Sequence, residues 1–144
     1  MNDFEFYLEE GDVKKRKPDM ELAKSLLKDA MVRFEKVSRL DVDEFAKIIF
    51  ENIYDAIRDV LDALLALDGY KSYSHEASIA YLKKYGLSPL IPEMDSFRAL
   101  RNSSKYYGKD ILPDSTRDIK EFYTSNVNKI INITEEKLDE CAKK

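Results

Sequence analysis

Hydrophobic residues recur every three or four positions over long stretches of this chain, which is the spacing of amphipathic helices. One such stripe covers residues 22–37, and a second, wider stripe covers residues 45–65. The second stripe is too wide for a helix that lies on a protein surface. It predicts a long central helix, which Asp41 or Asp43 would cap and which Gly69 would end.

Shorter stripes predict the remaining helices. These are a leading helix around residues 4–8, a helix over residues 75–85 after the cap Ser74, a helix over residues 93–107 and a last helix over residues 114–141. No stretch alternates apolar and polar residues as a half-buried strand does. We therefore expect an all-α, up-and-down bundle of four or five helices with short connections.

The chain has 144 residues, which is the usual size of one domain. Residues 1–18 form a charged N-terminal segment with a possible short helix, and residues 19–144 are expected to form a single helical domain. A basic run, residues 14–17, follows an acidic start. It could be a nucleic-acid-binding arm or a solvated linker.

The charge and cysteine content exclude several classes of protein. A net charge of −4 argues against a general electrostatic attraction for nucleic acid, so any contact with RNA would be local. Cys141 is the single cysteine, which excludes a disulfide framework and a cysteine-based metal site. No apolar run approaches the roughly 20 residues of a membrane span, and the acidic start is unlike a signal peptide. We expect a cytoplasmic protein with no membrane contact, no cofactor and no metal.

Most of the candidate chemistry lies at the end of the helix predicted over residues 93–107. Residues 101–108 read RNSSKYYG, so a base, an amide, hydroxyls and phenols lie close together. Successive residues of a helix turn by about 100°, which places Ser104 and Lys105 on the face of Arg101 and turns Tyr106 away.

Three pieces of the sequence, in this order, resemble the HEPN domain, an all-α bundle of four or five helices. They are NIYDAIR at residues 52–58, GYKSYSHE at residues 69–76 and LRN at residues 100–102. The resemblance extends from about Asp19 to the last predicted helix. Within the first piece, it implies a supporting role for Asn52, Asp55 and Arg58.

HEPN ribonucleases carry an arginine, a polar residue directly after it and, beyond a short spacer, a histidine. Arg101 and Asn102 match the first half of that motif, but Tyr106, Tyr107 and Gly108 occupy the positions where the histidine would stand. Tyrosine, with a pKa near 10, is a poor base at neutral pH. The resemblance therefore implies that catalytic RNA cleavage is lost or much reduced.

The resemblance also implies a homodimer in which the arginines of two copies face one cleft. We expect a non-catalytic RNA- or nucleotide-binding module, whose ligand-binding residues would be Arg101, Asn102, Ser104, Lys105 and Tyr106. One alternative is a substrate-binding or toxin partner of a minimal nucleotidyltransferase. Another is a weak metal-independent ribonuclease, with Arg101 and Tyr106 as the catalytic candidates.

The same residues also have purely structural interpretations. Arg101 could form an ion pair with an acid of the central helix: Glu51, Asp55 or Asp59. The acids at positions 55, 59 and 62 could belong to a solvated helix face. His75, the single histidine, follows a helix cap and could be solvated there. The helical angle of Tyr107 places it with the core.

Overall fold

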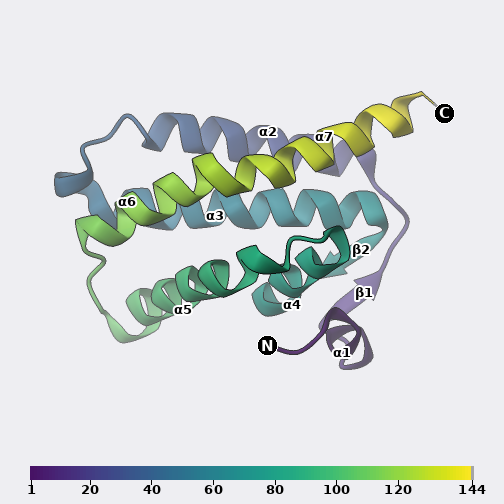
Figure 1. Cartoon of the computed structure of the whole chain (residues 1–144), viewed down its shortest axis with the longest axis horizontal. Coiled ribbons are helices and arrows are strands. Elements are labelled where there is room, and N and C mark those ends of the chain that lie inside the picture. The colour runs from purple at the N-terminus through teal and green to yellow at the C-terminus, as the bar shows by residue number, and fades with distance from the viewer. Residues whose placement is uncertain (144) are drawn as a thin grey trace.

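The structure, a computed structural model that describes residues 1–143, confirms the predicted all-α bundle. Its longer helices are α2 (Met20–Val37), α3 (Val42–Asp68), α5 (Ile91–Tyr107), α6 (Pro113–Phe122) and α7 (Asn128–Ala142). Figure 1 shows α3 between α2 and α5, with α6 and α7 running along the side of α2 and α3. No helix within residues 1–143 is both long enough and apolar enough to cross a bilayer.

Helix α3 is the centre of the fold, as its wide apolar stripe predicts. It contacts each of the other longer helices, and most of its residues are buried. The carboxylate of Asp41, and not that of Asp43, accepts a hydrogen bond from the backbone N–H of Glu44 and caps the helix. Gly69 ends it in a left-handed conformation, with φ of 86°.

Shorter elements close one end of the bundle. They are α1 (Phe4–Glu9), β1 (Val13–Lys15), β2 (Tyr70–Ser72), α4 (His75–Ala80) and two 3-10 turns, Tyr81–Tyr85 and Ser88–Leu90. The two strands form an antiparallel pair in which Val13 faces Ser72 and Lys15 faces Tyr70. The expectation of no strands is therefore wrong, because a three-residue strand is too short to show an alternating pattern.

Residues 1–18 pack against the bundle through α1 and β1. Tyr7 and Val13 are buried, and the Phe4 ring contacts the rings of Tyr70 and Tyr81. The basic run at residues 14–17 thus begins in a strand, and the N–H of Arg16 donates to the carbonyl of Gly69.

Two other element boundaries differ from the sequence prediction. Helix α5 begins at Ile91, because Pro92 lies in its first turn, where a backbone N–H has no helical partner to lose. The predicted last helix is divided into α6 and α7 by a π-helical turn at Tyr123–Val127. In the predicted stripes, the side chains of three residues are exposed and do not join the core: Leu22, Met31 and Ile48.

Candidate functional site

One face of α3 carries polar side chains that are only half-buried, although the rest of the helix belongs to the core. Arg33 of α2 and Arg101 of α5 lie beside this face. Together, the three helices line an open surface pocket of about 320 Å³, which we call the arginine groove. Its lining residues are Arg33, Asp55, Arg58, Asp59, Asp62 and Arg101.

Asp55 is the shared counter-ion of two groove arginines. Its carboxylate oxygens lie 3.5 Å from Nη2 of Arg101 and 3.6 Å from Nη1 of Arg33. This confirms Asp55 as the ion-pair partner of Arg101 among the three acids that the sequence offered. Both distances are longer than the 2.7–2.9 Å typical of a tight charged hydrogen bond, so each guanidinium keeps hydrogen-bonding capacity.

Arg101 is held in place mainly by packing. Its side chain is 12% exposed, and its guanidinium carbon lies 5.7 Å from the centre of the Tyr54 ring, within the range of a cation–π contact. The Nε of Arg101 is buried and has no hydrogen-bond partner within residues 1–143, and neither has the Oγ of Ser104 one turn later. A buried polar atom without a partner is costly, so the packing around this part of α5 carries an energetic penalty.

Arg58 is the uncommitted cation of the groove. It is half-buried, and its guanidinium makes no hydrogen bond or ion pair to any residue that the structure describes. A guanidinium offers five N–H donors in one plane. Arg58 can therefore bind an incoming acceptor without giving up an existing contact.

Asp59 and Asp62 also lack a hydrogen bond or ion pair within the described chain. Burial raises the pKa of Asp62 to about 6, although the positive charges of Arg58 and Lys71 act in the opposite direction. Burial raises the pKa of Asp59 as well. These carboxyl groups therefore differ from those of the solvated helix face that the sequence suggested, and the groove becomes more positive as the pH falls.

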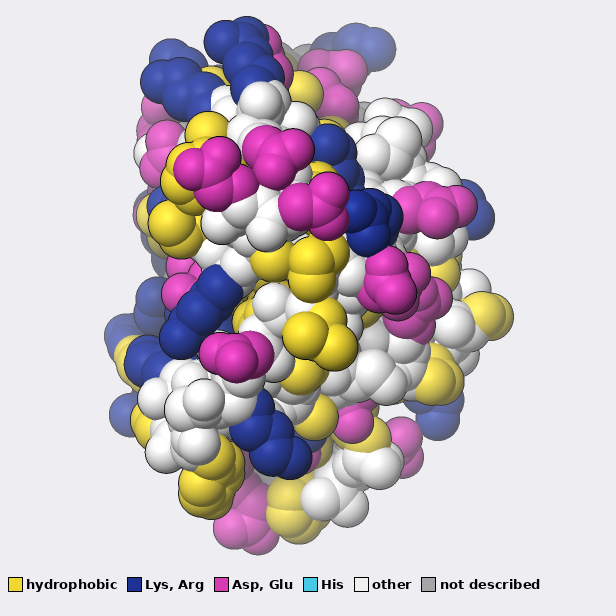
Figure 2. Space-filling view, turned by 90° about the vertical axis from the view of Figure 1, so that its left-hand side faces the viewer, with side chains coloured by type: hydrophobic (Ala, Val, Ile, Leu, Met, Phe, Trp, Pro, Cys, Tyr) yellow, Lys and Arg dark blue, Asp and Glu magenta, His cyan; other side chains and the backbone are white. Residues whose placement is uncertain are grey.

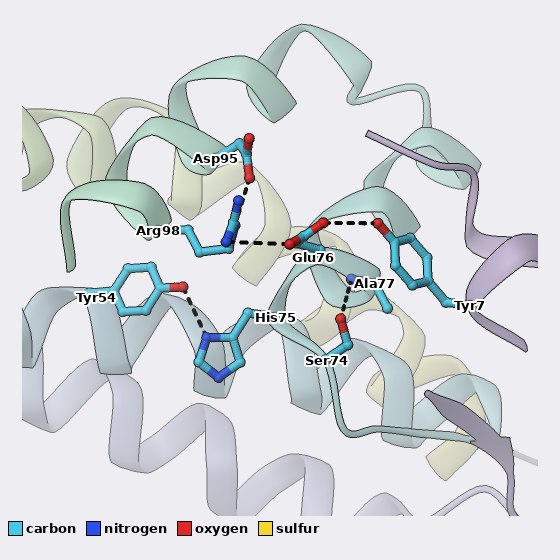
Figure 3. A network of polar contacts seen from close by, with 8 residues as sticks. All are labelled: Tyr7, Tyr54, Ser74, His75, Glu76, Ala77, Asp95 and Arg98. Carbon is cyan, nitrogen blue, oxygen red and sulfur yellow. Dashed lines mark hydrogen bonds and ion pairs between the residues drawn. The ribbon is translucent and has the colours of Figure 1, made fainter. Parts of the chain in front are cut away.

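The single histidine of the chain lies near the same arginines. The Nδ1 of His75 is 3.3 Å from the Tyr54 hydroxyl, and Figure 3 shows its second ring nitrogen pointing away from Tyr54. Burial and the positive charges of Arg58, Arg101 and Arg98 lower the pKa of His75 to about 4. The imidazole is therefore neutral at neutral pH, and its charge state is sensitive to what happens at the groove arginines.

A polar network holds α4, which carries His75, against α1 and α5 (Figure 3). Arg98 lies 3.4 Å from the carboxylate of Glu76 and 2.7 Å from that of Asp95, and the Tyr7 hydroxyl donates to Glu76 across 3.2 Å. Because Arg98 and Arg101 both belong to α5, this network ties the helix of His75 to the helix that carries Arg101.

Several residues predicted from the RNSSKYYG stretch do not line the groove. Asn102 is half-buried elsewhere on α5, Ser104 is buried, and Lys105 is exposed, with its ammonium 5.6 Å from the centre of the Tyr106 ring. Tyr106 is 68% exposed. The predicted core position of Tyr107 is wrong, since this side chain is 81% exposed near the end of α5, where no other helix covers it.

Of the three predicted supporting residues, the structure brings Asp55 and Arg58 into the groove with Arg101. Asn52 lies on the same face of α3, but its side-chain amide donates to the carbonyl of Ile48. Sequence reasoning missed Arg33, because nothing in a single helix pattern shows which face of a neighbouring helix it will meet.

The end of the molecule that carries the α2–α3 turn and the α5–α6 connection shows acids and bases intermixed around hydrophobic side chains (Figure 2). The exposed apolar residues of these segments are Leu40, Tyr106, Tyr107 and Leu112. No single sign of charge dominates this face, so a polyanion would find only local attraction here.

The groove is lined by three guanidinium groups and three carboxyl groups, two of which have raised pKa values, with a phenol and a neutral imidazole close by. Burial raises the pKa of Tyr54 to about 12, so its hydroxyl stays protonated and can donate. Within residues 1–143, no three histidine, cysteine or acidic side chains are grouped so that they could hold a metal ion. This set of groups is suited to binding an oxyanion.

Comparison of the chain with protein-family models, with curated proteins and with solved structures finds no match. The resemblance to HEPN domains thus rests on the sequence motifs alone.

Proposed function

We propose that this protein is an RNA- or nucleotide-binding module whose arginine groove holds a phosphate group. The observation that carries the proposal is the convergence of Arg33, Arg58 and Arg101 from three helices on one pocket. Guanidinium groups match phosphate oxygens in both charge and geometry. Arg58 makes no hydrogen bond or ion pair within the described residues, so its donors are available to a ligand.

The groove acids are compatible with this role. Asp55 is already neutralised by two arginines, at 3.5 and 3.6 Å. Asp59 and Asp62 have raised pKa values, so they are more easily neutralised by protons than ordinary carboxylates. The chain has a net charge of −4, so it does not attract a polyanion over its whole surface. Binding through a small pocket that contains arginines is consistent with this charge.

The proposal includes a homodimer in which the end of α5 contributes to the interface. Tyr106 and Tyr107 are 68% and 81% exposed, and they lie on the same helix as Arg101. Exposed aromatic side chains are enriched at protein interfaces, because they bury a large area when a partner covers them. A second copy on this surface would bring the two α5 helices, and thus the two grooves, closer together.

The binding proposal is tested with a short labelled single-stranded RNA and three variants. Arg58→Gln and Arg101→Gln remove groove donors, and each should weaken binding by about tenfold or more, the usual effect of losing charged hydrogen bonds. Arg117→Gln is the matched control, because Arg117 is half-exposed on α6 and pairs with Asp43 and Asp114 outside the groove. Equal affinities for all three variants would show that RNA does not use the groove.

A second candidate function is weak, metal-independent RNA cleavage. It is favoured by His75, whose uncharged imidazole lies near Arg58 and Arg101, but its pKa of about 4 makes it a weak base, so only slow cleavage is expected. Tyr106, the earlier candidate, does not line the groove. Incubation of RNA with the protein and a metal chelator tests this function. Cleavage should disappear in His75→Ala and Arg101→Ala but persist in Tyr106→Phe, and equal rates in all of them would assign it to a contaminant.

A further inference from the structure

The acids of the arginine groove determine when an anion can enter it. The six lining side chains carry three positive and three negative charges when all are ionised. Asp55 is occupied by its two arginines, but Asp59 and Asp62 make no hydrogen bond or ion pair to any residue in the described range. An anion that reaches Arg58 therefore also meets two carboxyl groups that lack a direct ion pair, in a half-buried setting where repulsion is screened less than in water.

Asp62 is placed to relieve this repulsion. It lies one helical turn after Arg58 on α3, and the other charged groups that face it are Asp59 on α3 and Lys71 on β2. Asp59 faces two arginines, Arg33 and Arg58, and two acids, Asp29 and Asp55, and it is less deeply buried than Asp62. Because burial disfavours the charged form of a carboxyl group, Asp62 is the one of the two that takes up a proton more readily.

We propose that the arginine groove binds an oxyanion, specifically a phosphodiester of single-stranded RNA, together with a proton that Asp62 takes up. This inference rests on the proposed phosphate-binding function. Burial has already raised the pKa of Asp62 to about 6, and a neighbouring anion raises it further, so uptake falls in the neutral range. The protein then binds RNA more tightly as the pH falls, by linkage between the proton and the anion.

The other titratable groups near the groove are less suited to this role. Burial and three arginines hold the pKa of His75 at about 4, too low for much proton uptake at neutral pH. The Tyr54 hydroxyl is already protonated, since its pKa is about 12. The pKa of His75 instead reports whether the groove is occupied. An anion bound to Arg58 and Arg101 would offset the positive charges that lower this pKa.

The test measures the affinity of the protein for a fluorescent oligouridylate. Neither the phosphodiesters nor the bases of this RNA change charge between about pH 5.5 and pH 7.5. A change of affinity over this range therefore reports a titrating group of the protein. At constant ionic strength, the affinity of the unmodified protein should fall about tenfold over this range, as expected for one linked proton. Asp62→Asn should bind with little pH dependence and more tightly than the unmodified protein at the higher pH. Asp118→Asn, an exposed acid on α6, should behave like the unmodified protein.

The outcomes separate the inference from the function on which it rests. RNA binding with equal affinity at both pH values overturns the proton uptake but leaves the binding function intact. An unchanged pH dependence in Asp62→Asn overturns the assignment to Asp62. Failure to bind RNA at either pH overturns the binding function and the inference together.

Nuclear magnetic resonance provides a readout independent of affinity. His75 is the single histidine, so its imidazole signals are unambiguous. Its pKa should rise when oligouridylate is added, because RNA in the groove masks Arg58 and Arg101. Binding that leaves the pKa of His75 unchanged would place the RNA elsewhere and overturn both the groove function and the inference.

Discussion

Asp62 shows how one side chain on a central helix can link stability to pH. It is half-buried on α3 and makes no hydrogen bond or ion pair within residues 1–143, and burial raises its pKa from 3.8 to about 6. A raised pKa means that the folded protein binds this proton more tightly than the unfolded chain does. Asp62 is therefore harmless below about pH 4, lowers stability progressively as the pH rises from about 4 to about 6, and has its full destabilising effect above that range.

The substitution Asp62→Asn should stabilise the protein at alkaline pH. Because Asp62 is partly solvated, we expect a gain of about 1–2 kcal/mol near pH 8, less than the full shift of its pKa implies, and almost none near pH 4. Urea denaturation at both pH values measures this difference. Asp118→Asn, on the exposed face of α6, is the control and should change stability little at either pH. An equal effect at both pH values would contradict the raised pKa.

At the scale of the elements, the carboxylate of Asp68 ties the end of α3 to two neighbours. It accepts hydrogen bonds from the hydroxyls of Tyr81 and Tyr85 in the 3-10 turn, and it lies 3.0 Å from the ammonium of Lys137 in α7. Its side chain is 8% exposed. Although burial opposes its ionisation, these hydrogen bonds lower the pKa of Asp68 below its usual value of 3.8.

Replacement of Asp68 by Asn should destabilise the bundle by about 2–4 kcal/mol at neutral pH, because Lys137 loses its counter-ion and the two phenols lose a charged acceptor. A lowered pKa stabilises the fold above about pH 4, and this contribution is lost as the pH falls below that value. The difference between the variant and the unmodified protein should therefore shrink in acid. Chemical denaturation against pH measures it, with Asp139→Asn on the exposed face of α7 as the control.

The junction of α3 and β2 requires a glycine at position 69 for two reasons. One is the left-handed backbone, and the other is the lack of space for a side chain. A Cβ at this position would lie 2.8 Å from the carbonyl oxygen of Arg16, whose N–H pairs with Gly69. The close approach of the two backbones is what allows β1 to pair with β2.

Gly69→Ala should therefore cost more stability than Gly86→Ala, which also has a left-handed backbone but no heavy atom within 4 Å of the added Cβ. We expect about 1 kcal/mol for Gly86→Ala, from backbone strain alone, and about 2–3 kcal/mol for Gly69→Ala. Thermal or chemical denaturation compares the two. Faster hydrogen exchange at β1 in Gly69→Ala would locate the damage, whereas equal losses of stability would contradict a steric clash.

At the scale of the whole molecule, the arrangement of helices places a polar, half-buried groove beside an aromatic, exposed helix end. The groove lies between α2 and α5 over α3, and the exposed Tyr106 and Tyr107 lie on the last turn of α5. Helix α5 contributes Arg101 to the groove and carries both exposed tyrosines. A partner that covers the tyrosines would therefore be close to any ligand in the groove.

We expect the protein to form a dimer at micromolar concentration, and light scattering measures its mass. The double substitution Tyr106→Ser with Tyr107→Ser should weaken this dimer, because it removes aromatic area that a partner would bury. Tyr73→Ser is the control, since Tyr73 is also exposed, at 58%, but follows β2. A monomer at all accessible concentrations would remove the dimer from the proposed function.

Parts of the candidate site could be predicted from the sequence. Arg101 was singled out by its polar neighbours, and Asp55 and Arg58 by the piece of sequence in which they lie, and all three line the groove. Arg33 could not be predicted, because its place depends on how α2 packs on α3. Tyr107 was misplaced because helical spacing indicates a direction from the helix axis but not whether another helix lies in that direction.

The sequence by itself determined the helical class, the central position of α3 and the helix ends at Ser74 and Gly69, because helical periodicity and capping are local properties of the chain. The tertiary structure alone decided which residues meet. The pairing of β1 with β2 and the approach of His75 to the groove arginines join segments that are far apart in the sequence. Such contacts depend on the packing of whole helices, and so the chemistry of the groove became visible only in the folded chain.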